Sequence, residues 1–353
     1  MQIHATNISG LGASHVVSSF LEAYLKNSNS NSVIHLPSSG PLLKFDHKNG
    51  LIKRYNRLMP HAVSRFIECY FSYLIFSDIE TIVLGDIPLR KIKNQIVLVH
   101  QPNLIYPKVN PYSSKALKYR VNRFLFSLNF KYAKKIIVQT GAMADDLIKS
   151  YPKIKNKVIV SPQPVPNWLQ TGFKLKIKPK TKEKLILFYP SAFYPHKKHD
   201  FLLSINKYII ENEISFDDVE IWLTIDKENF RAYSDVKFIK NLGQLSPSQM
   251  IDYYSKADAL LFISSVESYG LPLVEAIHIN LPAIIVDFSY SRCLFKDQAY
   301  YFQPYSEKSF VDTIKLFKSD YASGIYLNYA SIRTKFPKNW NKIVDLYLDE
   351  LKQ

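Results

Sequence analysis

The stretch ALLFISSVESYGLPLVEA, residues 259–276, contains in order the three parts of one α/β unit. Residues 259–263 are an uninterrupted apolar run with the length of a buried strand. Gly270 suits a tight turn because it has no Cβ, and Pro272 suits a first helical turn, where a missing N–H costs nothing. A strand, a turn and a helix in this order predict a parallel α/β sheet.

The same alternation recurs along the rest of the chain. Apolar runs typical of strands lie at residues 2–6, 32–36, 81–84, 96–99, 135–139, 158–160, 184–189, 219–225 and 283–286. Helical periodicity lies at residues 14–25, 142–150, 200–212, 247–256, 273–278, 309–318 and 340–351. Pro162, Pro164 and Pro166, followed by alternating lysines, predict a linker over 161–185. We therefore predict two α/β domains in tandem, over 1–165 and 175–335, with ligands beyond the carboxyl ends of the strands.

Composition and charge exclude several classes of protein. Of the 353 residues, 47% are hydrophobic and 22% are charged, so the chain is neither disordered nor fibrous. Its 46 basic and 30 acidic residues leave a net charge of +16, which favours nucleic acid, an anionic membrane surface or a phosphorylated substrate as a partner. Cys69 and Cys293 form no disulfide framework or metal-ligand spacing, which suits a reducing cytoplasm.

The turn after residues 259–263 carries the strongest chemical signal. Backbone N–H groups in the first turn of the following helix attract a phosphate or sugar oxygen. Glu275 lies one turn into that helix, where a carboxylate can accept hydrogen bonds from a ribose diol, and Glu267 lies before the turn, nearer a reacting sugar. The alternative is that both glutamates are exposed and flank an ordinary strand-to-helix turn.

This segment resembles the Glu-x7-Glu motif of the retaining glycosyltransferases of family 4, and the similarity covers most of residues 184–318. The resemblance implies the GT-B fold, two Rossmann-like domains facing a central cleft, with a C-terminal helix over 336–353 packing back on the N-terminal domain. It implies a nucleoside-diphosphate sugar as donor, of UDP or GDP type, and no cofactor. The residues implied to bind the donor here are Gly243, Leu245, Ser268, Tyr269, Gly270, Leu271 and Glu275, with Glu267 as a catalytic residue.

A second signal follows the strand at 184–189, where PSAFYPHKKH (190–199) precedes a helix. Lys197 and Lys198 at the carboxyl end of a strand suit a pyrophosphate. In the family, an Arg and a Lys five residues later neutralise the departing diphosphate. Lys197 matches that Lys as a catalytic residue, but Ala192 occupies the Arg position, so we expect Lys198 or a neighbouring histidine, His196 or His199, to compensate. The alternative is a solvated basic loop.

Two signals lie in the N-terminal half. SGLGAS (9–14), with Gly10 and Gly12, resembles the family's N-terminal glycine loop, which approaches donor phosphates and acceptor. His15 stands where a dinucleotide fingerprint needs its third glycine, so that reading is weak. His100 follows the strand at 96–99, and the resemblance places such a His close to the reacting sugar. A lone histidine is otherwise more often structural.

Two basic stretches interleave cations with aromatic residues, over 113–135 and 51–76. In the second, Lys53, Arg54, Arg57 and Arg65 stand beside Leu58, Phe66, Tyr70 and Phe71. These stretches predict contact with an anionic membrane surface, the alternative being core helices with a solvated charged face. The N-terminus lacks a signal-peptide layout and no apolar run approaches the ~20 residues that span a bilayer, so we expect peripheral contact.

The resemblance to the family implies a retaining glycosyltransferase acting on a saccharide acceptor carried by a lipid diphosphate, in O-antigen or capsule synthesis at the inner face of the cell membrane. The chain has no Asp-x-Asp, so no metal is expected. Three alternatives stay open. They are a GT-B protein that has lost catalysis and serves in assembly, another GT-B enzyme such as a phosphorylase or epimerase, and a basic nucleic-acid-binding protein. The last has no recognised module, so nucleic acid is not expected as a partner.

Overall fold

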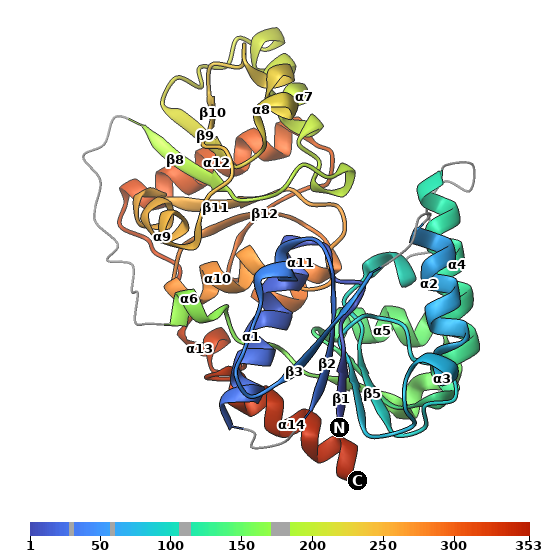
Figure 1. Ribbon diagram of the computed structural model, residues 1–353. Helices are drawn as coiled ribbons and strands as arrows, with labels where there is room; N and C mark the ends of the chain where they lie inside the picture. The colour runs from blue at the N-terminus through green and yellow to red at the C-terminus, as the bar shows by residue number, and fades with distance from the viewer. Residues whose placement is uncertain (28–31, 57–60, 106–113, 171–183) are drawn as a thin grey trace. The chain divides into compact units, whose positions relative to one another are not determined.

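The computed structural model describes residues 1–27, 32–56, 61–105, 114–170 and 184–353. The chain divides into two compact units (Figure 1). Unit 1 comprises residues 1–166 together with 336–353, and unit 2 comprises residues 167–335. Each unit contains one parallel sheet with helical crossovers, so the predicted α/β class is confirmed.

Unit 1 contains a seven-stranded parallel sheet in the order β3-β2-β1-β4-β5-β6-β7. Its strands are β1 (Gln2–His4), β2 (Val33–Pro37), β3 (Leu51–Tyr55), β4 (Thr81–Val83), β5 (Gln95–Leu98), β6 (Ala133–Val138) and β7 (Val158–Val160). Its α-helices are α1 (Leu11–Asn27), α2 (His61–Tyr70), α3 (Ser72–Ile75), α4 (Ser114–Asn129), α5 (Gly141–Ser150) and α14 (Trp340–Lys352). Short 3-10 turns are η1 (Pro41–Lys44), η2 (Pro102–Leu104), η3 (Phe130–Tyr132) and η4 (Pro152–Lys157). The C-terminal helix α14 packs against α1 and β5.

Unit 2 contains a six-stranded parallel sheet in the order β10-β9-β8-β11-β12-β13. Its strands are β8 (Leu185–Tyr189), β9 (Val219–Leu223), β10 (Ile239–Asn241), β11 (Ala259–Phe262), β12 (Ala283–Val286) and β13 (Tyr300–Phe302). Its α-helices are α6 (Asn167–Gln170), α7 (Asp200–Glu211), α8 (Lys227–Phe230), α9 (Pro247–Lys256), α10 (Leu271–Ile279), α11 (Ser289–Phe295), α12 (Glu307–Ala322) and α13 (Ala330–Arg333). Two 3-10 turns, η5 (Pro195–Lys197) and η6 (Arg231–Tyr233), complete it.

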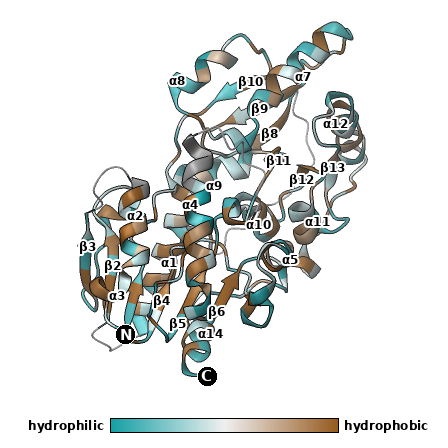
Figure 2. Ribbon diagram, turned by 90° about the vertical axis from the view of Figure 1, so that its right-hand side faces the viewer, coloured by the Kyte–Doolittle hydropathy of each residue, from teal (hydrophilic) through white to brown (hydrophobic). Residues whose placement is uncertain are grey.

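The central strands explain why the sequence folds this way. A parallel strand covered by helices on both faces reads as a continuous apolar run, and β5, β11 and β12 are buried along their whole length. Figure 2 shows β5 and β6 in the brown of apolar residues. The order of the strands reverses between β1 and β4 in unit 1 and between β8 and β11 in unit 2. Ligands of such sheets bind at these switch points, beyond the carboxyl ends of the strands.

Three edge strands, β3, β10 and β13, were not predicted. β3 and β10 are partly exposed, and β13, although mostly buried, is only three residues long, so none of them shows a long apolar run. The boundary between the two units, after residue 166, falls inside the predicted linker, but residues 161–170 are mostly buried and end in α6. Within unit 1, the indole N–H of Trp340 donates to the carbonyl of Val165 at 3.1 Å, so the prolines here form a packed extended segment. The lysines at 174–182 lie outside the described residues.

None of the helices described in the structure is long and apolar enough to cross a lipid bilayer.

Candidate functional site

The loops that follow β8 and β11 meet at the switch point of unit 2. The carbonyl of His196, in the β8 loop, accepts hydrogen bonds from the backbone N–H of Ser265 at 2.7 Å and the hydroxyl of Ser264 at 3.1 Å. Both serines lie in the loop after β11. Two of the segments selected from the sequence are therefore joined at the place where the fold predicts a ligand.

Lys197 and Glu267 form an ion pair across these loops. The Lys197 Nζ lies 2.5 Å from Glu267 Oε1, and the two side chains are only 14% and 11% exposed. The hydroxyl of Tyr189 donates to the Lys197 carbonyl at 2.6 Å, and the Lys197 ammonium lies 5.2 Å from the ring centre of Phe262. The lysine is thus held in place by both strands of the switch point, and the interpretation as a solvated basic loop is wrong for it.

Of the three residues expected to compensate for Ala192, the two histidines have lowered pKa values. Burial lowers the pKa of His199 to about 4, with the positive charge of Lys197 adding to the shift, and the His199 Nε2 lies 2.9 Å from the Ser191 hydroxyl. Burial also lowers the pKa of His196. Lys198 adopts a left-handed conformation, with a φ of 54°, and its ammonium lies 5.6 Å from the ring centre of Tyr305. The histidines are therefore poor substitutes for an arginine.

Gly270 makes the turn into α10. Its φ is +70°, and a Cβ at this position would lie 2.9 Å from the Leu273 Cδ1. The backbone N–H of Leu273 donates to the Gly270 carbonyl at 2.8 Å, and the helix begins at Leu271. Pro272 has no N–H, and the Leu273 and Val274 N–H groups both donate to the Gly270 carbonyl, so it is the positive end of the helix dipole that favours an anion at this turn.

Glu275 is buried one turn into α10. The hydroxyl of Tyr254, in α9, donates to Glu275 Oε2 at 2.5 Å. Burial raises the pKa of Glu275 to about 7, and the hydrogen bond from Tyr254 opposes that shift. Because Glu267 and Glu275 are both mostly shielded from water, the alternative of two exposed glutamates is wrong. Tyr254 was not selected from the sequence, since it has no motif of its own and lies 21 residues from Glu275.

The remaining residues selected in unit 2 lie in two loops. Ser268 and the buried Tyr269 occupy the turn between β11 and α10. Gly243, with a φ of +71°, and Leu245 lie in the loop after the edge strand β10. Because all six strands are parallel, both loops lie at the carboxyl edge of the sheet, but β10 is two strands away from β8.

In unit 1 the glycine loop lies at the corresponding switch point. The Gly10 carbonyl accepts from the backbone N–H of Ser14 at 2.9 Å, so α1 begins earlier than predicted and includes Gly12. The side-chain amide of Asn7 donates to the Gly85 carbonyl at 3.0 Å, which joins the loops after β1 and β4. Gly10 and Gly12 therefore lie at the open end of the sheet, as the strand-to-helix position predicts.

His100 is held by Asp86, which was not selected from the sequence. Asp86 Oδ1 accepts from the backbone N–H groups of His100 at 2.7 Å and Gln101 at 2.9 Å, and Asp86 Oδ2 lies 3.7 Å from His100 Nε2. Asp86 adopts a left-handed conformation, with a φ of 70°. The sequence offered one signal for Asp86. It is an acidic residue in the loop after β4, and β4 lies next to β5, the strand that precedes His100.

A buried ionic cluster in unit 1 corrects the interpretation of residues 51–76. The Arg65 guanidinium donates to Glu68 Oε2 at 3.0 Å and to the Gly85 carbonyl at 2.7 Å. Glu68 Oε1 lies 3.0 Å from His4 Nε2 and accepts from the Thr6 hydroxyl. Arg65 is thus a buried cation and cannot contact a membrane. Phe66 and Tyr70 pack against Cys69 and Leu125, whereas Arg57 and Leu58 lie outside the described residues.

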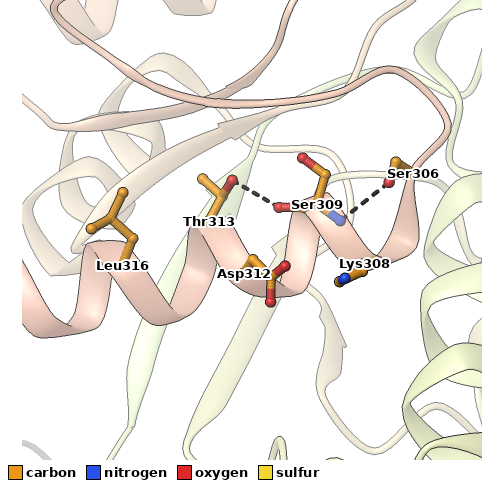
Figure 3. Close-up of a pocket in the computed structure, with 6 residues that line it drawn as sticks. All are labelled: Ser306, Lys308, Ser309, Asp312, Thr313 and Leu316. Carbon is orange, nitrogen blue, oxygen red and sulfur yellow. Dashed lines mark hydrogen bonds between the residues drawn. The ribbon is translucent and has the colours of Figure 1, made fainter.

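Two surface pockets contain none of the residues expected to bind the donor or to act in catalysis. One of about 310 Å³ lies along the first turns of α12 in unit 2, between Ser306 and Leu316 (Figure 3). Hydrogen bonds inside the helix already engage its polar groups, such as the Thr313 hydroxyl, which donates to the Ser309 carbonyl at 2.8 Å. The other, of about 430 Å³, lies in unit 1 and is lined by Lys93, Lys131, Lys134 and Lys157 among others. The site is therefore defined by the converging loops of each sheet.

The chain resembles glycosyltransferases in both sequence and fold. Residues 171–334 match the family model described as Glycosyl transferases group 1. The whole chain superimposes on the lipopolysaccharide glycosyltransferase WaaG with a TM-score of 0.69, at 11% identity, covering 100% of this chain and 98% of that one. A sucrose-phosphate synthase from Thermosynechococcus elongatus gives a TM-score of 0.71, at 13% identity, covering 99% and 97%. The predicted GT-B fold is confirmed.

Among curated proteins, the chain is similar to the O-antigen chain mannosyltransferase RfbU of Salmonella typhimurium. The two are 25% identical over 237 residues, which cover 65% of this chain and 62% of RfbU. The serotype-specific mannosyltransferase WbdA of Escherichia coli is 36% identical over 61 residues, 17% of this chain and 8% of WbdA. The chain thus matches less than two thirds of the length of either relative.

Proposed function

We propose that this protein is a retaining glycosyltransferase that moves a hexose from a nucleoside-diphosphate sugar to a saccharide acceptor in bacterial surface-polysaccharide synthesis. The observation that carries the proposal is the Lys197–Glu267 pair, which lies at the switch point of unit 2 in the loops that precede α7 and α10. The similarity to RfbU, named as an O-antigen chain mannosyltransferase, supports the reaction class and makes mannose the first donor sugar to test.

The electrostatic problem of this reaction is the negative charge that grows on the leaving diphosphate. Fixed cations and helix N-termini that point at this charge lower the barrier, because they need no reorganisation. In our proposal Lys197 supplies the principal charge, and Lys198 together with the Gly270–Leu271 turn assists. Glu267 positions the donor sugar. Glu275 holds the ribose, with Ser268, Tyr269, Gly243 and Leu245 completing the donor site.

We further propose attack on the same face of the sugar from which the diphosphate leaves. The bond between the anomeric carbon and the phosphate oxygen breaks, the acceptor oxygen bonds to that carbon, and the departing phosphate oxygen takes the acceptor's proton. His100 acts on the reacting sugar, with Asp86 holding its backbone, and Gly10 and Gly12 leave room for the phosphates. No metal is required in this scheme, so turnover should persist in a chelator.

The acceptor in this proposal is a saccharide carried by a lipid diphosphate, and the enzyme works at the inner face of the cell membrane. The net charge of +16 supports contact with an anionic surface. A GT-B protein that has lost catalysis is the second candidate. It is favoured by Ala192 in the arginine position and by the depressed pKa values of His196 and His199, which leave Lys198 as the replacement cation.

A thermal-shift screen against UDP, GDP and their sugars tests the donor site, because a ligand that binds the native state alone raises the melting temperature. We expect one nucleotide series to stabilise the wild type and to stabilise Glu275→Ala less. Release of nucleoside diphosphate on adding acceptor then separates an active enzyme from an assembly protein. No stabilisation by any donor would overturn the proposal.

A further inference from the structure

Helix α2 of unit 1 directs its two charged side chains towards the interior of the unit. Arg65 and Glu68 are buried, whereas Val63 and Ile67 on the same helix are 53% and 46% exposed. A helix on the surface of a globular domain ordinarily has the opposite arrangement, with apolar side chains towards the core. One apolar stripe of α2, with Val63 and Ile67, therefore faces outward, while Phe66, Cys69 and Tyr70 pack inward beside the two charges.

The buried cluster fixes this orientation. Glu68 contacts Arg65, His4 and Thr6, and Arg65 also donates to the Gly85 carbonyl, so the two charges are paired inside the unit. Removing one partner of a buried pair leaves an uncompensated charge, which is strongly destabilising. Rotation of α2 to bury its apolar side would break these contacts, so its exposure is built into the fold.

The exposed apolar surface continues from α2 into α3. We call it the α2–α3 face, and it consists of Val63, Ile67, Phe71, Leu74 and Ile75. Leu74 is 73% exposed, the most of the five. Within the described segment 63–76, both charged residues are buried, so the face itself carries no exposed charge. Contiguous apolar surface of this kind marks an interaction site.

Cations border this face. The Arg90 guanidinium lies 4.0 Å from the ring centre of Tyr70, and the Lys91 ammonium lies 4.1 Å from that of Tyr73. Lys93 follows in the same loop, while Asp78 and Glu80 lie beyond the end of α3. Asp78 accepts a hydrogen bond from the Lys93 backbone at 2.9 Å. An apolar centre next to basic side chains is complementary to a lipid bilayer with anionic headgroups.

We propose that the α2–α3 face inserts into the surface of an anionic membrane, with the exposed Lys91 and Lys93 contacting the headgroups. The inference deepens the proposed function, since it names the surface through which the enzyme reaches a lipid-linked acceptor. A second copy of the chain is the less favourable occupant. Each copy has a net charge of +16, and an isologous contact would place the bordering cations of both copies together.

Flotation with lipid vesicles tests the apolar part of the face. The wild type should float with vesicles that contain phosphatidylglycerol, and Ile67→Ser with Leu74→Ser should lower the partition coefficient by about tenfold or more. Ile210→Ser with Leu316→Ser is the matched control, because these apolar side chains of unit 2 are 68% and 55% exposed. The control should float as the wild type does. Equal flotation of the Ile67/Leu74 variant, or none by the wild type, would overturn the inference.

The charged border is tested separately. Lys91→Glu should weaken flotation several-fold and reduce its sensitivity to salt, whereas Lys315→Glu on α12 should change it little. Flotation that is equally strong on neutral phosphatidylcholine vesicles would contradict the anionic partner. Sedimentation velocity tests whether a second copy of the chain covers the α2–α3 face instead. A dimer that forms with rising concentration and that the Ile67/Leu74 substitutions abolish would show that the partner is a second copy and not a membrane.

Donor binding by the same variants distinguishes this inference from the proposed function. The Ile67/Leu74 variant should keep the wild-type melting temperature and its stabilisation by nucleotide, because its substitutions lie on the surface of unit 1. A wild type that binds donor but not vesicles refutes the inference alone. A wild type that binds vesicles but no donor refutes the proposed function alone.

Discussion

The two sheets present the same kind of edge, but the groups at the two edges differ. In unit 2 the loops at the switch point are joined by an ion pair, Lys197 with Glu267, and a second lysine follows directly. In unit 1 the neutral amide of Asn7 joins the corresponding loops by donating to the Gly85 carbonyl, which also accepts from the buried Arg65, and the Asp86 carboxylate lies beside His100. One fold can therefore offer cations for an anionic leaving group at one edge and a carboxylate–histidine pair at the other.

Among the predictions that test this difference between the two edges, removal of the Lys197 ammonium should change the activity most. We expect Lys197→Ala to lower kcat about 100- to 1,000-fold, the range measured when one preorganised group that stabilises developing charge is removed. Release of nucleoside diphosphate measures it. Lys207→Ala, which removes an exposed lysine of α7, is the control and should leave kcat unchanged. Similar losses in the two variants would contradict the role given to Lys197.

The buried carboxyl of Glu275 should make the stability of the protein depend on pH. Burial raises its pKa to about 7 from an ordinary value of 4.5, so between these values the folded protein holds a proton that the unfolded chain releases. Stability should therefore fall as pH rises through this window, by up to roughly 3 kcal/mol from this group. Urea unfolding at about pH 5 and about pH 8 measures the change.

Glu275→Gln is the comparison for that experiment, since it cannot ionise and should lose less stability over the same window. Tyr254→Phe removes the hydrogen bond that opposes the shift, so it should move the transition to higher pH. Donor affinity is expected to change in the opposite direction, rising with pH, because a charged carboxylate is the better acceptor for a ribose diol. A wild type and a Glu275→Gln variant with the same pH dependence would show that Glu275 has an ordinary pKa.

Asp86 tests the edge of unit 1. Asp86→Ala removes the acceptor for the His100 and Gln101 backbones and should lower kcat by about 10- to 100-fold, as displacement of a positioned group does. Asp86→Asn keeps an acceptor oxygen and tolerates the left-handed backbone, so its loss should be smaller. Donor-induced thermal shifts should be unchanged in both, since the proposed donor site lies in unit 2. A loss of donor affinity with unchanged kcat would refute a positioning role.

The smallest effect concerns two glycines of unit 2. Gly270→Ala should lower the free energy of unfolding by about 1–3 kcal/mol, from a positive φ and from contact of the new Cβ with Leu273. Gly243→Ala has the same conformational penalty, with a φ of +71°, but nothing lies within 4 Å of its Cβ. It should therefore cost only about 1 kcal/mol. Equal costs measured by urea unfolding would show that the contact with Leu273 relaxes.

The interior of each sheet was predictable because its pattern is local. The central strand β12 and helix α9 have the bounds that the apolar periodicity predicts, and so does β7, although it lies at an edge of its sheet. The edge strands β3, β10 and β13 were missed, since none of them shows the long apolar run on which such predictions rest. The candidate residues Lys197 and Glu267 could be selected from their places after strands, but their contact joins positions 70 residues apart. Asp86 and Tyr254 belong to no motif, so their roles become visible only through their contacts in the fold, with His100 and with Glu275.

The order of strands, turns and helices, and with it the two α/β halves, follows from the sequence alone, because each element needs only its own run of apolar residues. The orientation of α2 does not. Its periodicity shows two unlike faces, and the usual rule would turn Arg65 outward and Ile67 inward. The opposite holds because His4 and Thr6, from β1 and the loop after it, pair with Glu68 and stabilise its charge inside the unit. Contacts between segments distant in the chain decide which face of a helix is buried, and these exist only in the folded protein.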